Sequence, residues 1–111
     1  MYDTSSLINL KKKGESLEDG QDFTTIFSII EYPKALEIKN LTIIYPQKST
    51  FETAVHLSSQ LLRHGTPIPA MDILIASIAI IKNLVLITKD KHFELIKSIQ
   101  PDFKLNLITN S

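Results

Sequence analysis

Apolar residues are most densely grouped in the stretch PIPAMDILIASIAIIKNLVLITKD, which runs from Pro67 to Asp90. The side chains from Met71 to Ile81 are almost all apolar, which predicts a helix that the rest of the protein covers on most sides. Lys82 and Asn83 end that helix. The apolar, partly β-branched run Leu84–Thr88 then predicts a buried strand. This helix and this strand should form the centre of the fold.

Two acids stand out against this apolar background. Asp72 lies in the first turn of the predicted helix, and Asp90 follows the predicted strand. Taken singly, Asp72 could serve only to complement the helix dipole, and Asp90 could be an ordinary turn residue. A third acid, Asp3, could likewise be only a helix N-cap or a terminal acid. At the edge of so apolar an element, however, the carboxylates of Asp72 and Asp90 should be held in fixed positions, as in a functional site.

The remaining chain alternates between strand-like and helix-like segments. Further strands are predicted at 23–26, 41–45 and 104–108, with Met1–Tyr2 as a candidate strand end. Further helices are predicted from a cap at Thr4, Ser5 or Ser6 to Lys13, over 27–36, from a cap at Ser49 or Thr50 to Arg63, and over 94–99. This alternation predicts an α/β fold with a parallel sheet and helices on both faces, in a single domain of residues 1–111.

Local signals refine the boundaries of these segments. Three lysines before Gly14 are typical of the last turn of a helix and its stop. Residues 15–22 are polar and predict a loop or a fragment of helix. Pro33 falls within the segment 27–36, so that helix either starts late or is kinked. The residues that helical spacing places in the core of the segment ending at Arg63 include Phe51, Leu61 and Leu62.

The composition is that of an ordinary globular protein, with 111 residues, 43% of them hydrophobic and 22% charged. The formal net charge is zero, so binding of nucleic acid would need a local patch or metal ions. Cysteine is absent, which excludes disulfides and thiolate metal sites. The first residues lack the charge order of a signal peptide, and no apolar run is long enough to cross a membrane. We therefore expect a soluble, cytoplasmic protein.

Four acids fall near the carboxyl ends of predicted strands or the starts of helices: Asp3, Glu31, Asp72 and Asp90. Sites in open parallel sheets form outside the carboxyl ends of the strands, so these side chains are expected to meet in one pocket. Clustered carboxylates repel one another unless a cation compensates them. Oxygen ligands without cysteine or paired histidines select Mg²⁺ or Mn²⁺ rather than zinc. The chemistry that such a site favours is metal-assisted hydrolysis of a phosphodiester.

The same residues carry a resemblance to a known family. DTSSLI begins at Asp3, Glu31 follows a predicted strand, DILIASIA begins at Asp72, and LVLITKD ends at Asp90. In this order and spacing the chain resembles PIN-domain proteins, and more narrowly the VapC-type toxins of prokaryotic toxin–antitoxin systems. The matching motifs span nearly the whole chain.

That resemblance implies a Rossmann-like, three-layer sandwich with about five parallel strands. It implies an Mg²⁺- or Mn²⁺-dependent endoribonuclease that acts on RNA as a homodimer and is held by a small antitoxin protein. The catalytic and metal-binding carboxylates would be Asp3, Glu31, Asp72 and Asp90, with Glu31 binding the metal or orienting the attacking water. Thr4, Ser5 and Thr88 would lie nearby as polar supports to the metal or the phosphate.

Two features depart from the family pattern. Only Met1 and Tyr2 precede Asp3, where relatives have several apolar residues, so the first strand is short or the true start lies upstream. Glu31 and Leu41 are also close in sequence, where most relatives have a helical hairpin that contributes to dimerisation and antitoxin contact.

Other functions compete with this interpretation. A non-catalytic PIN-like module that binds RNA or a protein is the alternative. A different phosphate-handling enzyme is less favoured, because the chain has no glycine-rich phosphate loop. The lysines at 11–13 could contact an RNA backbone, but a solvated helix end explains them as well. The histidines are interpreted as surface or packing residues, with a substrate contact as a further role for the last of them: His56, His64 and His92.

Overall fold

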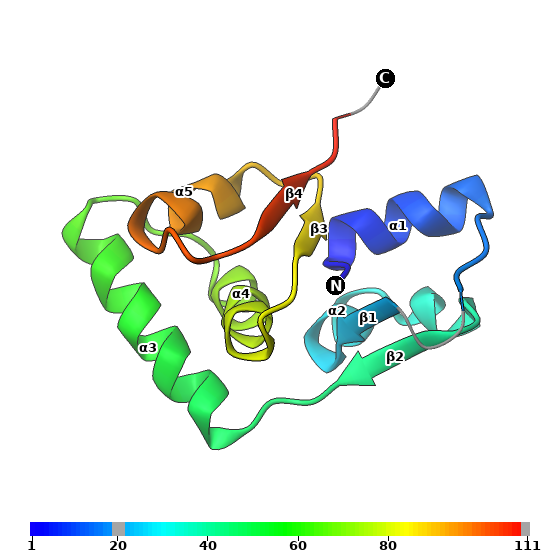
Figure 1. Ribbon diagram of the computed structural model, residues 1–111, viewed down its shortest axis with the longest axis horizontal. Coiled ribbons are helices and arrows are strands. Elements are labelled where there is room, and N and C mark those ends of the chain that lie inside the picture. The colour runs from blue at the N-terminus through cyan, green and yellow to red at the C-terminus, as the bar shows by residue number, and fades with distance from the viewer. Residues whose placement is uncertain (19–21, 110–111) are drawn as a thin grey trace.

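The computed structural model describes residues 1–18 and 22–109, so part of the predicted loop, residues 19–21, lies outside it (Figure 1). Over these ranges the chain forms five α-helices, a 3₁₀ helix and four short strands, which confirms the predicted α/β class. The helices are α1 (Thr4–Lys13), α2 (Ile26–Glu31), η1 (Pro33–Glu37), α3 (Lys48–Arg63), α4 (Ala70–Lys82) and α5 (His92–Ile99). The strands are β1 (Asp22–Thr25), β2 (Leu41–Ile44), β3 (Leu86–Thr88) and β4 (Leu105–Leu107).

The described strands form two parallel pairs. β1 pairs with β2, starting with Asp22 opposite Leu41, and β3 pairs with β4, starting with Leu86 opposite Leu105. The parallel direction predicted from the alternation of helices and strands is therefore confirmed for both pairs.

The segment before α1 joins these pairs without becoming a strand. Tyr2 makes isolated parallel bridges to Thr24 and Ile87, and its backbone N–H donates to Phe23 O at 2.8 Å. The backbone turns into α1 directly after Asp3, so this segment forms bridges only. The predicted sheet of five strands is thus replaced, among the described residues, by two pairs that are bridged at Tyr2.

Helices lie on both sides of these strands, with α1 on one side of β3 and α4 on the other (Figure 1). The centre of α4 is fully buried, as the sequence predicts, with Ile75, Ala76, Ile78 and Ala79 at most 1% exposed. The main core joins α4 to α3, α5, β3 and β4. A smaller core lies around α1, α2 and η1 and consists of Leu7, Ile29 and Ala35. No helix among the described residues combines the length and apolarity needed to cross a membrane.

The predicted ends of two helices are confirmed. Gly14 follows α1 with a φ of 65°, and Asn83 follows α4 with a φ of 56°. This left-handed conformation ends the helical hydrogen-bond pattern, and glycine and asparagine adopt it more readily than other residues.

The caps predicted at 4–6 and 49–50 are wrong, because these residues lie inside their helices. Asp3 caps α1, since its side chain accepts the backbone N–H of Ser6 at 2.9 Å, which confirms the N-cap role considered for this acid. Gln47 is the N-cap of α3, so this helix begins earlier than predicted, and the Thr50 hydroxyl accepts the backbone N–H of Gln47 at 3.0 Å.

Pro33 breaks the predicted helix over 27–36. α2 ends at Glu31, and η1 begins at Pro33 as a separate 3₁₀ helix. Proline lacks a backbone N–H and is tolerated only in the first turn of a helix, which is the position that it takes in η1. The break leaves Glu31 as the last residue of α2.

The predicted core of α3 is only partly confirmed. Leu61 is 1% exposed, but Leu62 is 73% and Phe51 is 48% exposed, so the prediction is wrong for these two. Consecutive helical residues point about 100° apart, so only one of two neighbouring leucines can enter the buried core. Val55, at 71% exposed, extends the same apolar outer face of α3, which lines a groove beside α4.

Candidate metal centre

Asp72, Asp90 and His92 lie together at the carboxyl end of β3. Each offers one ligand atom, and these atoms all lie within 4.8 Å of one another. His92 Nδ1 is 3.2 Å from Asp90 Oδ1 and 3.6 Å from Asp72 Oδ2. The Asp72 side chain is 17% exposed and that of His92 is 53% exposed, so the group extends from the edge of the core into solvent.

Separate elements place these side chains. Asp72 lies in the first turn of α4, where its backbone N–H donates to Pro69 O at 3.1 Å. Asp90 follows β3, and its backbone N–H donates to Thr88 Oγ1 at 2.9 Å. Asp90 Oδ1 in turn accepts the backbone N–H of His92 at 2.9 Å, which fixes the turn into α5. The position of the group is therefore set by backbone bonds as well as by side chains.

Asp3 is buried beside this group and is fully engaged in hydrogen bonds. Its Oδ1 accepts the Ser6 backbone N–H and the Ser5 hydroxyl, both at 2.9 Å. Its Oδ2 accepts the Thr88 hydroxyl at 2.6 Å. Thr88 Oγ1 thus connects Asp3 to the backbone of Asp90, and Ser5 and Thr88 orient Asp3.

Glu31 lies at the solvent side of the same region, at the end of α2. Its Oε1 accepts the Thr4 hydroxyl at 2.6 Å. Thr4 follows Asp3 directly, so this bond ties the end of α2 to the start of α1. Neither Glu31 nor Asp3 belongs to the compact group of Asp72, Asp90 and His92.

The predicted acids nevertheless interact electrostatically. Burial raises the pKa of Asp72 to about 6, the charges of Asp90, Glu31 and Asp3 add to this rise, and His92 opposes it. Burial also raises the pKa of Asp3, although hydrogen bonds from Thr88, Ser6 and Ser5 counteract it. A site with this excess of negative charge favours a bound cation.

No protein-family model and no curated protein matches the chain, but solved structures do. VapBC-1 from nontypeable Haemophilus influenzae is 22% identical with a TM-score of 0.76, over 96% of each chain. DNA-bound VapBC from Salmonella typhimurium is 20% identical with a TM-score of 0.79, over 96% of this chain and 95% of that chain. VapBC2 from Rickettsia felis, bound to a DNA fragment from its promoter, is 23% identical with a TM-score of 0.66, over 93% of this chain and 84% of that chain.

The chain has the VapC-type fold. The TM-scores of 0.76 and 0.79 establish similarity of fold, and the coverage shows that this similarity extends over nearly all of both chains. The resemblance to VapC-type proteins, recognised from the ordered motifs in the sequence, is confirmed at this level.

The donor set of this chain fits a divalent cation. Two carboxylates and an imidazole lie close enough to share one ion, and carboxylate oxygens are the ligands that Mg²⁺ and Mn²⁺ take in proteins. Burial is the largest cause of the raised pKa of Asp72, and the neighbouring charges of Asp90 and Glu31, which a cation would offset, are the next.

His92 is the member of the group that the sequence interpretation undervalued. The D-x-H spacing from Asp90 to His92 was a visible signal, since it places both residues in one turn at the start of α5. The sequence could not show that Asp72, from α4, lies against the same imidazole. His56 and His64 are exposed on and just after α3, as predicted.

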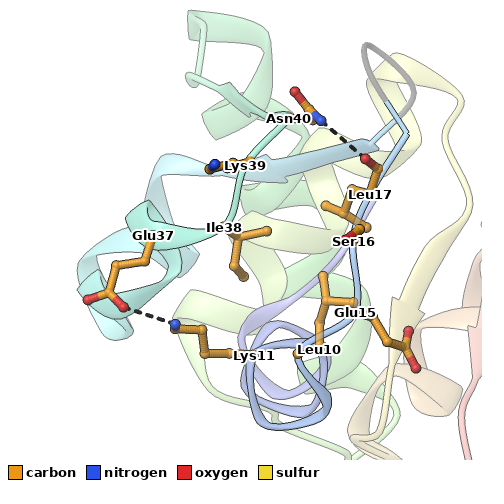
Figure 2. A pocket seen from close by; sticks show the side chains of 10 residues that line it. Leu10, Lys11, Glu15, Ser16, Leu17, Glu37, Ile38, Lys39 and Asn40 are labelled. Atoms are coloured by element: carbon orange, nitrogen blue, oxygen red, sulfur yellow. Dashed lines mark hydrogen bonds and ion pairs between the residues drawn. The ribbon is translucent and has the colours of Figure 1, made fainter.

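Two cavities among the described residues lie away from this group. One cavity of about 290 Å³ lies beyond the C-terminal end of α1, beside the turn that precedes β2 (Figure 2). A salt bridge of 2.9 Å from Lys11 to Glu37 borders it, as does a hydrogen bond of 3.2 Å from Asn40 Nδ2 to Leu17 O. A groove of about 510 Å³ between α3 and α4 is mainly apolar. The carboxylate group is therefore an open, polar site, separate from both.

Proposed function

We propose that this protein is a divalent-metal-dependent endoribonuclease and the toxin of a prokaryotic toxin–antitoxin pair. The observation that carries the proposal is the meeting of Asp72, Asp90 and His92 at the carboxyl end of β3. The VapC-type fold supports it, because sites in parallel α/β folds form at that edge. A fold by itself does not assign a function, so the proposal depends on the chemistry of these side chains.

In this proposal Asp72 and Asp90 hold an Mg²⁺ or Mn²⁺ ion. Once bound, the ion supplies positive charge that stabilises a phosphate in the transition state and lowers the pKa of a water molecule. Asp3 adds a negative charge that attracts the ion. Its orientation is fixed by Ser5 and Thr88, so no rearrangement is needed to present it.

Glu31 is proposed to orient the attacking water and to accept its proton. It is exposed, so a water molecule can reach it. The hydrogen bond from Thr4 holds Oε1, so Oε2 would receive the proton. Thr4 therefore supports Glu31 in the same way that Ser5 and Thr88 support Asp3.

The proposed partners are RNA as substrate, a small antitoxin protein and a second copy of the chain. The matched VapBC structures support the antitoxin, and two of them are bound to DNA, which fits repression of the operon by the toxin–antitoxin pair. The exposed apolar side chains of α3 support contact with protein, because soluble proteins rarely expose such groups together without a partner.

Cleavage of RNA by matched variants tests the proposed activity. Structured and single-stranded RNAs are incubated with Mg²⁺, Mn²⁺ or EDTA and with wild-type or Asp72→Asn protein. We expect cleavage that requires a metal and falls at least about 100-fold in the variant, because a ligand is lost.

Asp102→Asn is the matched control, because Asp102 is exposed in the turn after α5 and the same charge is removed there. All proteins are purified identically, so that contaminating host ribonuclease appears equally in each. Equal cleavage by wild type and Asp72→Asn would contradict the proposed nuclease activity and favour a non-catalytic module that binds RNA or protein.

A further inference from the structure

We propose that His92 is a metal ligand of this site and that the site therefore prefers a first-row transition ion to Mg²⁺. The inference rests on the proposed function and adds to the predicted acids a nitrogen ligand that they do not include. It arises from the place of His92 Nδ1, which faces Asp72 and Asp90 together.

The separations between these atoms match those of ligands that share an ion. At metal–ligand distances of about 2.1 Å, neighbouring corners of an octahedron lie roughly 3 Å apart. His92 Nδ1 is 3.2 Å from Asp90 Oδ1 and 3.6 Å from Asp72 Oδ2. All three ligand atoms lie within 4.8 Å of one another, so rotation of the side chains would bring them onto one face of such an octahedron.

Contacts on both sides along the chain fix the backbone at His92. The backbone N–H of His92 donates to Asp90 Oδ1 at 2.9 Å. The next residue, Phe93, is 0% exposed and packs against Phe103, with 6.5 Å between ring centroids. His92 is therefore the exposed residue between an anchored acid and an anchored aromatic ring, so its imidazole is held near the carboxylates.

The chemistry of an imidazole nitrogen decides the preference between ions. Mg²⁺ favours oxygen ligands and keeps several waters. Divalent transition ions bind nitrogen more readily, and their affinities increase along the first row from Mn²⁺. Two carboxylates already balance a divalent charge, so a neutral third ligand strengthens the site without the repulsion that another carboxylate would add.

Direct measurement of metal binding tests this proposal without depending on cleavage. Mn²⁺ and Mg²⁺ are titrated calorimetrically into metal-free wild-type protein and into His92→Gln and His56→Gln variants. We expect wild type to bind Mn²⁺ more tightly than Mg²⁺, and His92→Gln to weaken Mn²⁺ at least about 10-fold while Mg²⁺ changes less than about threefold. His56→Gln is the matched control, because His56 is exposed on α3.

Pulsed electron paramagnetic resonance of the Mn²⁺-loaded proteins gives a second, spectroscopic result. Coordination by an imidazole produces ¹⁴N modulation of the Mn²⁺ signal. We expect that modulation in wild type and His56→Gln and its loss in His92→Gln. A structural role of His92 alone would not produce the modulation.

Each contrary outcome is distinct. Mn²⁺ affinity unchanged in His92→Gln, or wild-type protein without ¹⁴N modulation, would overturn the ligand assignment while leaving a metal-dependent nuclease intact. If His92→Gln lost Mn²⁺ and Mg²⁺ affinity equally relative to wild type, the proposed preference for a transition ion would be overturned. Wild-type protein that binds neither ion at millimolar concentration would overturn the proposed function itself, and this inference with it.

Discussion

Asp72 binds its proton more tightly in the folded protein than in the unfolded chain. Its pKa rises from 3.8 to about 6, first because burial disfavours the charge and then because Asp90 and Glu31 repel it. The proton thus stabilises the fold below pH 3.8, and that contribution is lost as the pH rises through about 6. Near neutral pH the ionised carboxylate therefore lowers the free energy of unfolding of the metal-free protein.

Asp72→Asn should therefore stabilise the metal-free protein near neutral pH. We expect the free energy of unfolding in urea to rise by about 1–2 kcal/mol at about pH 7.5, after allowance for screening by water. The gain should disappear at about pH 3.5, where the wild-type carboxyl is protonated in both states. Asp102→Asn serves as control in EDTA at both pH values. A variant that is less stable than wild type at about pH 7.5 would contradict burial and like-charge repulsion as the causes of the raised pKa.

At the scale of elements, the packing of α3 on α4 decides where the site acids lie. Ala76 and Ala79 of α4 are fully buried, and their small side chains let neighbouring elements approach closely. Leu57 and Leu61 of α3 belong to the same core cluster. This packing holds α4, and with it Asp72, in place beside the end of β3.

Adjacent leucines on α3 should respond very differently to truncation. Leu61→Ala should lower the free energy of unfolding by about 2–5 kcal/mol, because it removes a buried side chain and leaves a cavity. Leu62→Ala, at a side chain that is 73% exposed, should change it by less than about 0.5 kcal/mol in the monomer. Urea unfolding with an unchanged m-value checks both. Similar losses in the two variants would mean that the outer face of α3 is covered in solution.

At the scale of the whole molecule, the proposed ion would join segments that are far apart in sequence. Asp3 lies at the cap of α1, Glu31 at the end of α2, Asp72 in α4 and Asp90 after β3. Hydrogen bonds from Thr88 to Asp3 and from Thr4 to Glu31 already connect these segments in pairs. Binding of an ion at their meeting point should therefore stabilise the entire fold rather than one loop.

Mn²⁺ should raise the thermal stability of the wild-type protein. At a free concentration about 100 times its dissociation constant, the ion should add about 2.7 kcal/mol to the free energy of unfolding. For a domain of this size that corresponds to a rise of roughly 10 °C in Tm. EDTA should reverse the rise. Mn²⁺ should raise the Tm of the Asp102→Asn control as it does that of wild type, and it should not raise the Tm of Asp72→Asn. The same rise in Asp72→Asn would place the ion elsewhere on the molecule.

Much of the candidate site was predictable because its signals are local. Asp72 and Asp90 flank the most apolar part of the chain, and the structure brings them together. Their catalytic roles, and those of Asp3 and Glu31, stay predictions. The place of His92 was not predictable, because its contact with Asp72 joins residues of α5 and α4 that no sequence spacing relates.

The sequence by itself determined the α/β class, the parallel direction of the strand pairs, the burial of α4 and the ends of α1 and α4. These features follow from apolar periodicity and from glycine or asparagine at helix ends, which act over a few neighbouring residues. Tertiary structure alone decided that Tyr2 bridges two strand pairs, that Asp3 is enclosed by Ser5 and Thr88, and which leucine of α3 faces the core. Those outcomes depend on contacts between distant segments, whose free energies exist only once the helices and strands have packed.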